Sequence, residues 1–261
     1  MNLMTQHSAF LFRQSHSRAS CVYKMDRLLA FSSNFSEISQ DYHPPIELDE
    51  NATYILGLYS LNTYNTIANV IANVNDSIIL IKERENKELW ITLPEGAYEV
   101  EQIIDYINEK AFHNYSISDI QIKPNLNTQK IELFCEKTTI RFPKIASLGK
   151  LLGFSQPEYS AGIVHTSDSF VSISSVNEIN VECNIISGSY HNGDRCHTLY
   201  SFYPEVPPGY KISERPNQMI YLPVSVREIK NITLRLISQK GELVDFRGEE
   251  ISIQLNLRKL I

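Results

Sequence analysis

The stretch ISIQLNL at residues 251–257 alternates apolar and polar side chains without interruption. Because successive side chains of a strand point to opposite faces, this pattern predicts a strand with one buried and one exposed face. The stretch NITLRLIS at residues 231–238 has the same alternation. Turn signals at Lys240-Gly241 and near Gly248 separate the two stretches, and they favour a model in which these strands pair with each other.

Further strands are expected upstream, and together they indicate the fold class. Many short strands separated by turn signals predict an antiparallel, mainly β protein, either a sandwich or a barrel. Pro223 cannot donate a backbone hydrogen bond, so its strand has to lie at an edge or a bulge. The candidate strands alternate or are rich in β-branched and aromatic residues; they are 53–59, 77–82, 88–93, 116–123, 130–135, 138–142, 170–173, 179–185 and 218–224.

One clear helix is expected near residues 99–110. Its apolar residues recur at helical spacing, and polar residues take the opposite face; the apolar ones are Val100, Ile103, Ile104 and Ile107. A shorter helix over 145–152 is expected to end at Gly153, which can adopt the left-handed conformation of a helix C-terminus.

The composition of the 261 residues bounds the class of protein. With 43% hydrophobic residues the chain can build a sizeable core, enough for one large β domain or two small ones. The net charge of −6 argues against a surface for nucleic acid, so no direct nucleic-acid binding is expected. The longest apolar runs, near 28–31 and at 78–81, are far below the ~20 residues of a spanning helix, so no membrane span is expected.

The first 27 residues differ from the rest of the chain. Residues 1–27 carry Ser, His and scattered basic residues without sustained periodicity, which predicts a flexible N-terminal arm. They contain no apolar run that ends in a small-residue cleavage site, so we expect no secretory signal and an intracellular location during assembly. The four cysteines are widely spaced and form no CxxC pair, which favours reduced and mostly buried thiols.

A search for catalytic and metal-binding patterns gives one candidate cluster. Cys183, His191, Cys196 and His197 lie within fifteen residues, but their spacing does not match the usual zinc sites. The Asn192-Gly193 pair between them is more typical of a hairpin turn. The sequence has no GxSxG nucleophile motif and no Gly-rich phosphate loop. We therefore expect no enzyme, no catalytic residue, no metal and no cofactor.

The remaining candidate is an aromatic segment rich in proline. Its length without a strand pattern, from 201 to 217, indicates a role in assembly or binding. Aromatic residues also cover irregular loops, so packing, subunit contact and a ligand groove all remain open. The candidate assembly or binding residues are Tyr200, Phe202, Tyr203, Tyr210 and Tyr221.

Several short sequence motifs, in the order in which they occur along the chain, resemble those of a known family. The motif LPEGAY at 93–98 precedes the expected helix, and the ordered motifs cover the chain from Phe31 to Arg258. In these motifs the chain resembles the minor capsid, or penton-type, proteins of Polinton/Maverick elements and of the related adintoviruses. The other matching motifs are LLGF at 151–154, VECNII at 181–186, VPPGY at 206–210, YLPV at 221–224, VDFRGE at 244–249 and IQLNLR at 253–258.

The resemblance implies a jelly roll of two four-stranded antiparallel sheets and brings no catalytic residues. It implies a structural virion protein that forms a pentamer at capsid vertices, with the major capsid protein of the same element as partner. Residues 28–261 would form a single jelly-roll domain, with an α+β elaboration at about 92–155 between sandwich strands. The alternative is a β-sandwich binding module: a virion spike that binds a receptor or glycan, or a domesticated host protein.

Overall fold

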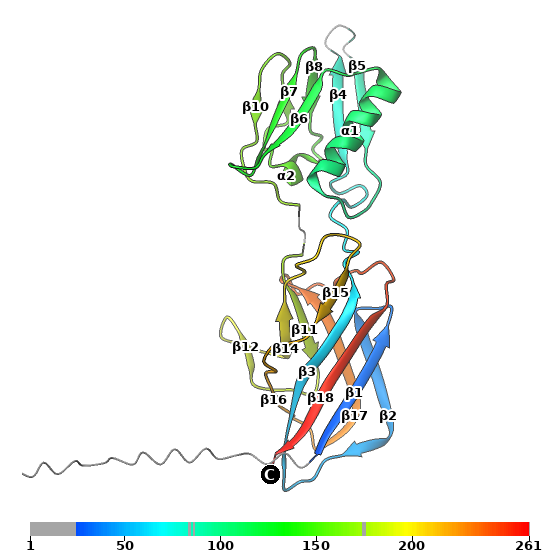
Figure 1. The fold of residues 1–261 in the computed structure, drawn as a ribbon, viewed down its shortest axis with the longest axis vertical. Helices are drawn as coiled ribbons and strands as arrows, with labels where there is room; N and C mark the ends of the chain where they lie inside the picture. The colour runs from blue at the N-terminus through cyan, green and yellow to red at the C-terminus, as the bar shows by residue number, and fades with distance from the viewer. Residues whose placement is uncertain (1–24, 83–84, 86, 174–175, 261) are drawn as a thin grey trace, which may run out of the picture.

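The structure, a computed structural model, describes residues 25–82, 85, 87–173 and 176–260. Within these residues the chain forms 18 strands and two helices, and every pairing between named strands is antiparallel. The prediction of a mainly β, antiparallel protein is therefore confirmed. Figure 1 shows that the strands gather in two parts, and each part has a hydrophobic core of its own.

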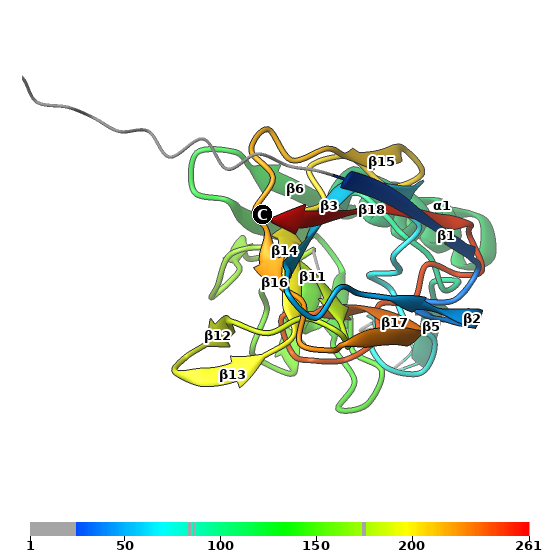
Figure 2. The same cartoon turned by 90° about the horizontal axis from the view of Figure 1, so that it is seen from below.

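The larger part is a sandwich of two facing sheets. One sheet has the order β1-β18-β3-β15, with β16 also paired to β3, and the other has the order β14-β11-β17-β2. Figure 2 shows the two layers from below. The strands of this part are β1 (Met25–Ser33), β2 (Glu37–Glu47), β3 (Thr53–Tyr64), β11 (Ile179–Cys183), β12 (Ser189–His191), β13 (Asp194–Cys196), β14 (Thr198–Phe202), β15 (Lys211–Glu214), β16 (Leu222–Pro223), β17 (Glu228–Ser238) and β18 (Ile251–Leu260).

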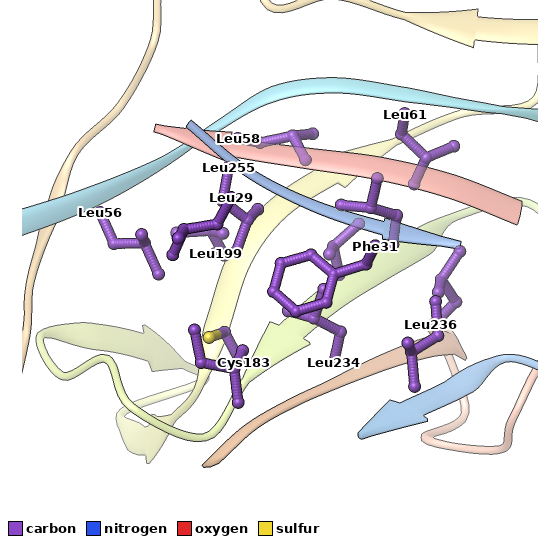
Figure 3. Packing of buried hydrophobic residues seen from close by; sticks show 14 of the residues in the cluster. Leu29, Phe31, Leu56, Leu58, Leu61, Cys183, Leu199, Leu234, Leu236 and Leu255 are labelled. Atoms are coloured by element: carbon purple, nitrogen blue, oxygen red, sulfur yellow. The ribbon is translucent and has the colours of Figure 1, made fainter. Parts of the chain in front are cut away.

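The core of the sandwich follows from the alternation in the sequence. Every second side chain of β18, from Ile251 to Leu257, is at most 1% exposed, and Leu234 and Leu236 of β17 are fully buried. Figure 3 shows side chains from both sheets meeting between the layers. The residues labelled there are Leu29, Phe31, Leu56, Leu58, Leu61, Cys183, Leu199, Leu234, Leu236 and Leu255.

The expected pairing of 231–238 with 251–257 is wrong. β17 pairs with β11 and β2, whereas β18 pairs with β1 and β3, in the facing sheet. Both glycines of the connection do have positive φ angles, 80° at Gly241 and 79° at Gly248. The connection crosses from one sheet to the other, so the two strands bury their apolar faces against each other across the core.

The smaller part, the inserted lobe, interrupts the sandwich between β3 and β11. Its core includes the buried face of α1, formed by Ile103, Ile104, Ile107 and Ala111. It also includes Val70, and Ile173 packs against it, so the lobe extends beyond the expected 92–155 at both ends. Its elements are β4 (Ser77–Lys82), β5 (Lys87–Thr92), α1 (Val100–Tyr115), β6 (Ile120–Asn125), β7 (Lys130–Cys135), β8 (Thr138–Arg141), α2 (Gly149–Leu152), β9 (Glu158–Tyr159) and β10 (His165–Thr166).

Most local predictions for this lobe are confirmed, but residues 170–173 form no strand, and α2 covers only the second half of the helix expected over 145–152. The clear helix is α1, which continues five residues past the expected end at 110. β4 pairs with β5 and β6 pairs with β7, so these expected strands form two antiparallel hairpins. α2 ends at Gly153, whose φ of 85° is left-handed. In the described part of the chain, no helix is long and apolar enough to cross a membrane.

The expected N-terminal arm lies mostly outside the described residues, which begin at residue 25. Its last three residues, 25–27, belong to β1 instead, where they pair with the end of β18. The strand therefore begins within the expected arm, because its first residues pair with Leu257–Lys259 through backbone hydrogen bonds that need no apolar side chain.

Candidate functional site

The five candidate aromatic residues do not form one cluster, and the segment 201–217 is not a continuous loop, because β15 lies within it. Phe202 lies in the sandwich core, 4% exposed, and Tyr200 stacks on it with ring centroids 6.3 Å apart. Tyr203 and Tyr210 face solvent, 61% and 65% exposed. Of the five, these two alone present most of their surface to a partner.

Tyr221 lies against the outer face of the sandwich. Its ring is 4.5 Å from the Arg258 guanidinium, measured to the ring centroid, and its hydroxyl is 3.2 Å from Asn256 Oδ1. A Cβ added at Gly57 would lie 3.1 Å from the same ring, so glycine leaves room for the tyrosine. Tyr221 therefore fixes the segment before β16 to the sheet, which is a packing role.

The edges of the two sheets meet at β14 and β15. The Tyr200 hydroxyl of β14 interacts with the Glu214 carboxylate of β15. The pKa of Glu214 is raised overall, because burial and the nearby Glu205 carboxylate raise it more than the interaction with Tyr200 lowers it. This contact ties the two sheets together on the side where Tyr210 is exposed.

Asn65 holds the loop that carries Tyr210, and sequence reasoning missed it. Its backbone N–H donates to the carbonyl oxygen of Tyr210 at 2.8 Å, and its side-chain amide donates to the carbonyl oxygen of Val206 at 2.7 Å. Its own carbonyl oxygen accepts the N–H of Gly209 at 2.7 Å. The signal available in the sequence was an asparagine directly after an apolar strand, which is a common place for side-chain to backbone bonds. We call this side, with Tyr203 and Tyr210, the β14–β15 edge.

On the opposite side of the sandwich, β1 and β2 are the edge strands, and exposed apolar side chains lie beside them. Phe35, in the turn between these strands, is 76% exposed, and Leu243 is 47% exposed. The turn is held in place because Asn34 donates its side-chain amide to the Gly248 carbonyl oxygen at 2.7 Å and the Ser36 hydroxyl donates to the Val244 carbonyl oxygen. We call this side, with Phe35 and Leu243, the β1–β2 edge; sequence reasoning did not single it out.

The residues of the candidate zinc cluster have separate roles. Cys183 lies in the sandwich core, whereas His191 is exposed on the β12–β13 hairpin (Figures 2 and 3). His197 Nδ1 donates to the carbonyl oxygen of Ile186, 2.9 Å away. Asn192 and Gly193 form the hairpin turn as predicted, with φ angles of 52° and 93°. Among the described residues, no group of three or more His, Cys, Asp or Glu is placed to hold a metal ion.

The described cysteines differ in reactivity, which gives a first prediction. Burial raises the pKa of Cys135 to about 12 and that of Cys183 to about 11. For Cys196, burial acts to raise the pKa, but hydrogen bonds from Ser189 and Thr198 outweigh it and lower the pKa. Because the thiolate is the reactive form, we expect iodoacetamide at pH 8 to label Cys196 at least about 100 times faster than Cys183. Peptide mapping by mass spectrometry measures this, and equal labelling of the two cysteines in native protein would contradict it.

Comparisons with known proteins find similarity among solved structures. No family model matches the chain, and no curated protein matches it. Among solved structures, the chain is similar to the crystal structure of the selenomethionine-labelled mavirus penton protein. The sequence identity is 12% and the TM-score is 0.49, with 90% of this chain and 100% of that chain covered.

Proposed function

We propose that this chain is a structural capsid protein of the penton type, from a Polinton-like or adintovirus-like element. In this proposal it forms a pentamer at a capsid vertex, its partner is the major capsid protein of the same element, and its location is the virion. The sandwich is a jelly roll, and the inserted lobe is an elaboration of the same domain. The observation that carries the proposal is the strand order of the sandwich.

The strand order supports a jelly roll because the chain crosses between the sheets at most connections. If the short β12–β13 hairpin is left out, and β15 and β16 are counted as one interrupted strand, the sandwich has eight strands. Numbered along the chain, the strands lie side by side in the order first, eighth, third, sixth in one sheet and fifth, fourth, seventh, second in the other. This is the order of a double Greek key, an architecture that viral capsid proteins share with lectin domains and cupins.

The two edges of the sandwich support a ring. A cyclic pentamer needs two different surfaces on each subunit, because each contact joins the head of one copy to the tail of the next. β1 and β2 end the two sheets on one side, and β15 and β14 end them on the other. Both edges carry exposed apolar or aromatic side chains, Phe35 on one and Tyr210 on the other. In the proposed ring, the β1–β2 edge of one copy packs on the β14–β15 edge of its neighbour.

The test is the mass of the full chain in solution, by light scattering and native mass spectrometry. We expect five times the 29.9 kDa of one chain. Phe35→Asp and Tyr210→Asp should each weaken the contact at least tenfold, because a carboxylate would replace a buried aromatic side chain at the interface. Phe112→Asp, on the exposed face of α1, is the matched control and should leave the pentamer intact.

Mixing the two edge variants separates a head-to-tail ring from a symmetric contact. Phe35→Asp protein keeps a native β14–β15 edge, and Tyr210→Asp protein keeps a native β1–β2 edge. An equimolar mixture should therefore form heterodimers that contain one copy of each variant, whereas neither variant should form dimers alone. A pentamer that survives both substitutions would contradict the assigned edges. A wild-type monomer that binds glycans on an array would contradict the pentamer and favour the binding module.

A further inference from the structure

A cavity of about 480 Å³ lies where the inserted lobe meets the sandwich. Figure 1 shows α2 at the end of the lobe that faces the sandwich. Lys150 of α2 and Lys144 of the preceding loop line the cavity from the lobe, and Lys240, in the turn after β17, lines it from the sandwich. The volume is within the range of sites that bind small molecules.

The cavity concentrates positive charge in an acidic protein. Its described lining contains three lysines and no Asp or Glu, although the whole chain has a net charge of −6. Within the described residues, none of these three lysines forms an ion pair, whereas Lys137, Lys230 and Lys259 each do. A concave site lined by one sign of charge attracts the opposite charge more strongly than a flat surface does.

Hydrogen bonds hold both walls of the cavity in place. The Gln239 side-chain oxygen accepts the backbone N–H groups of Asn177 and Glu178, at 3.2 and 3.4 Å, which fixes the residue before Lys240. On the lobe side, Asn75 accepts the N–H of Ile71 at 2.7 Å and donates to the carbonyl oxygen of Asn69 at 2.7 Å. Lys240 therefore extends from anchored backbone, and the 69–75 segment of the lobe wall is also held in place.

The composition of the lining indicates the chemistry of a ligand. Ammonium groups bind phosphate and sulfate as point charges, and three of them suit an anion with several charges. Ser147, Ser172 and Asn177 add hydroxyl and amide groups that suit a polyol. The described lining has no aromatic ring on which a nucleobase could stack. We propose that this cavity binds a multiply charged phosphate or sulfate ester of a sugar or cyclitol.

The experiment is calorimetric titration of the full chain with two probes of this chemistry. Inositol hexakisphosphate represents a phosphorylated cyclitol and a heparin-derived hexasaccharide represents a sulfated sugar, with uncharged myo-inositol as the neutral control. We expect one charged probe to bind, with an affinity that falls as salt is raised, because salt screens the charges. Binding should also raise the melting temperature, since the probe contacts only the folded chain.

Two double variants with the same loss of charge locate the site. Lys150→Gln with Lys240→Gln should weaken binding about a hundredfold, about tenfold for each charge-assisted hydrogen bond lost. Lys123→Gln with Lys211→Gln removes two exposed lysines away from the cavity and should change the affinity less than about threefold. Both double variants should melt like the wild-type chain without a probe, because the substituted side chains are exposed.

The outcomes divide clearly. Binding of inositol hexakisphosphate alone supports the site and identifies a phosphate ester, and binding of the hexasaccharide alone supports it and identifies a sulfated sugar. Failure of both charged probes to bind at low salt would overturn the proposal. Equal losses in the two double variants would also overturn it, because attraction to the whole surface would then explain the binding.

Discussion

Leu234→Asp is expected to abolish folding of the sandwich. Leu234 is fully buried in the middle of β17, and it is paired with Ile38 on one side and Cys183 on the other. The substitution places a carboxylate in an apolar core without a charged partner, which costs several kcal/mol even if the group takes up a proton. A loss of that size is a large part of the total stability of a domain, about 5–15 kcal/mol.

The measurement is the yield of folded protein and its thermal unfolding, compared with two further variants. Leu234→Ala removes the same side chain without adding a charge and should cost about 2–5 kcal/mol, so it remains measurable if the aspartate variant cannot be purified. Lys230→Asp introduces the same carboxylate at an exposed position of β17 and should change stability by less than about 1 kcal/mol. Normal folding of Leu234→Asp would mean that the assigned register of β17 is wrong.

The sequence predicted which faces of the strands are buried, but not which strands pair. Alternation placed Leu234, Ile253 and Leu255 on inward faces, and all three are fully buried. The same alternation suits any antiparallel partner, so it could not tell that β17 and β18 lie in opposite sheets. Partner choice depends on contacts between residues far apart in the chain, such as the pairing of β1 with β18.

The candidate site was predicted only in part, because composition does not separate a buried ring from an exposed one. Tyr210 and Phe202 belong to the same aromatic segment, yet one faces solvent and the other fills the core. Phe35 lies outside every strand and helix expected from the sequence, so nothing marked it as an exposed residue. Lys144, Lys150 and Lys240 are far apart in the sequence, so a shared cavity could be found only in the folded chain.

Gly153→Ala is expected to unfold the inserted lobe while the sandwich stays folded. Gly153 has a φ of 85°, and its ideal Cβ would lie 2.3 Å from the backbone carbonyl oxygen of Ser169. The left-handed conformation alone costs a non-glycine residue about 1–2 kcal/mol. The clash adds to this cost, because a backbone atom cannot rotate away as the end of a side chain can. Gly153 also accepts the N–H of Ser169 at 3.0 Å, so moving the two segments apart would break a hydrogen bond.

Gly162→Ala separates the clash from the strained conformation. Gly162 has a similar φ of 78°, but no atom lies within 4 Å of its ideal Cβ, so its substitution should cost only the conformational term. Hydrogen exchange read by mass spectrometry distinguishes the two parts of the chain. In Gly153→Ala protein we expect faster exchange in β4, β7 and α1 and native protection in β17 and β18, since the two cores are separate. Equal destabilisation by the two alanines would show that Ser169 yields to the added methyl group, and loss of protection in β17 and β18 as well would show that the two cores unfold as one cooperative unit.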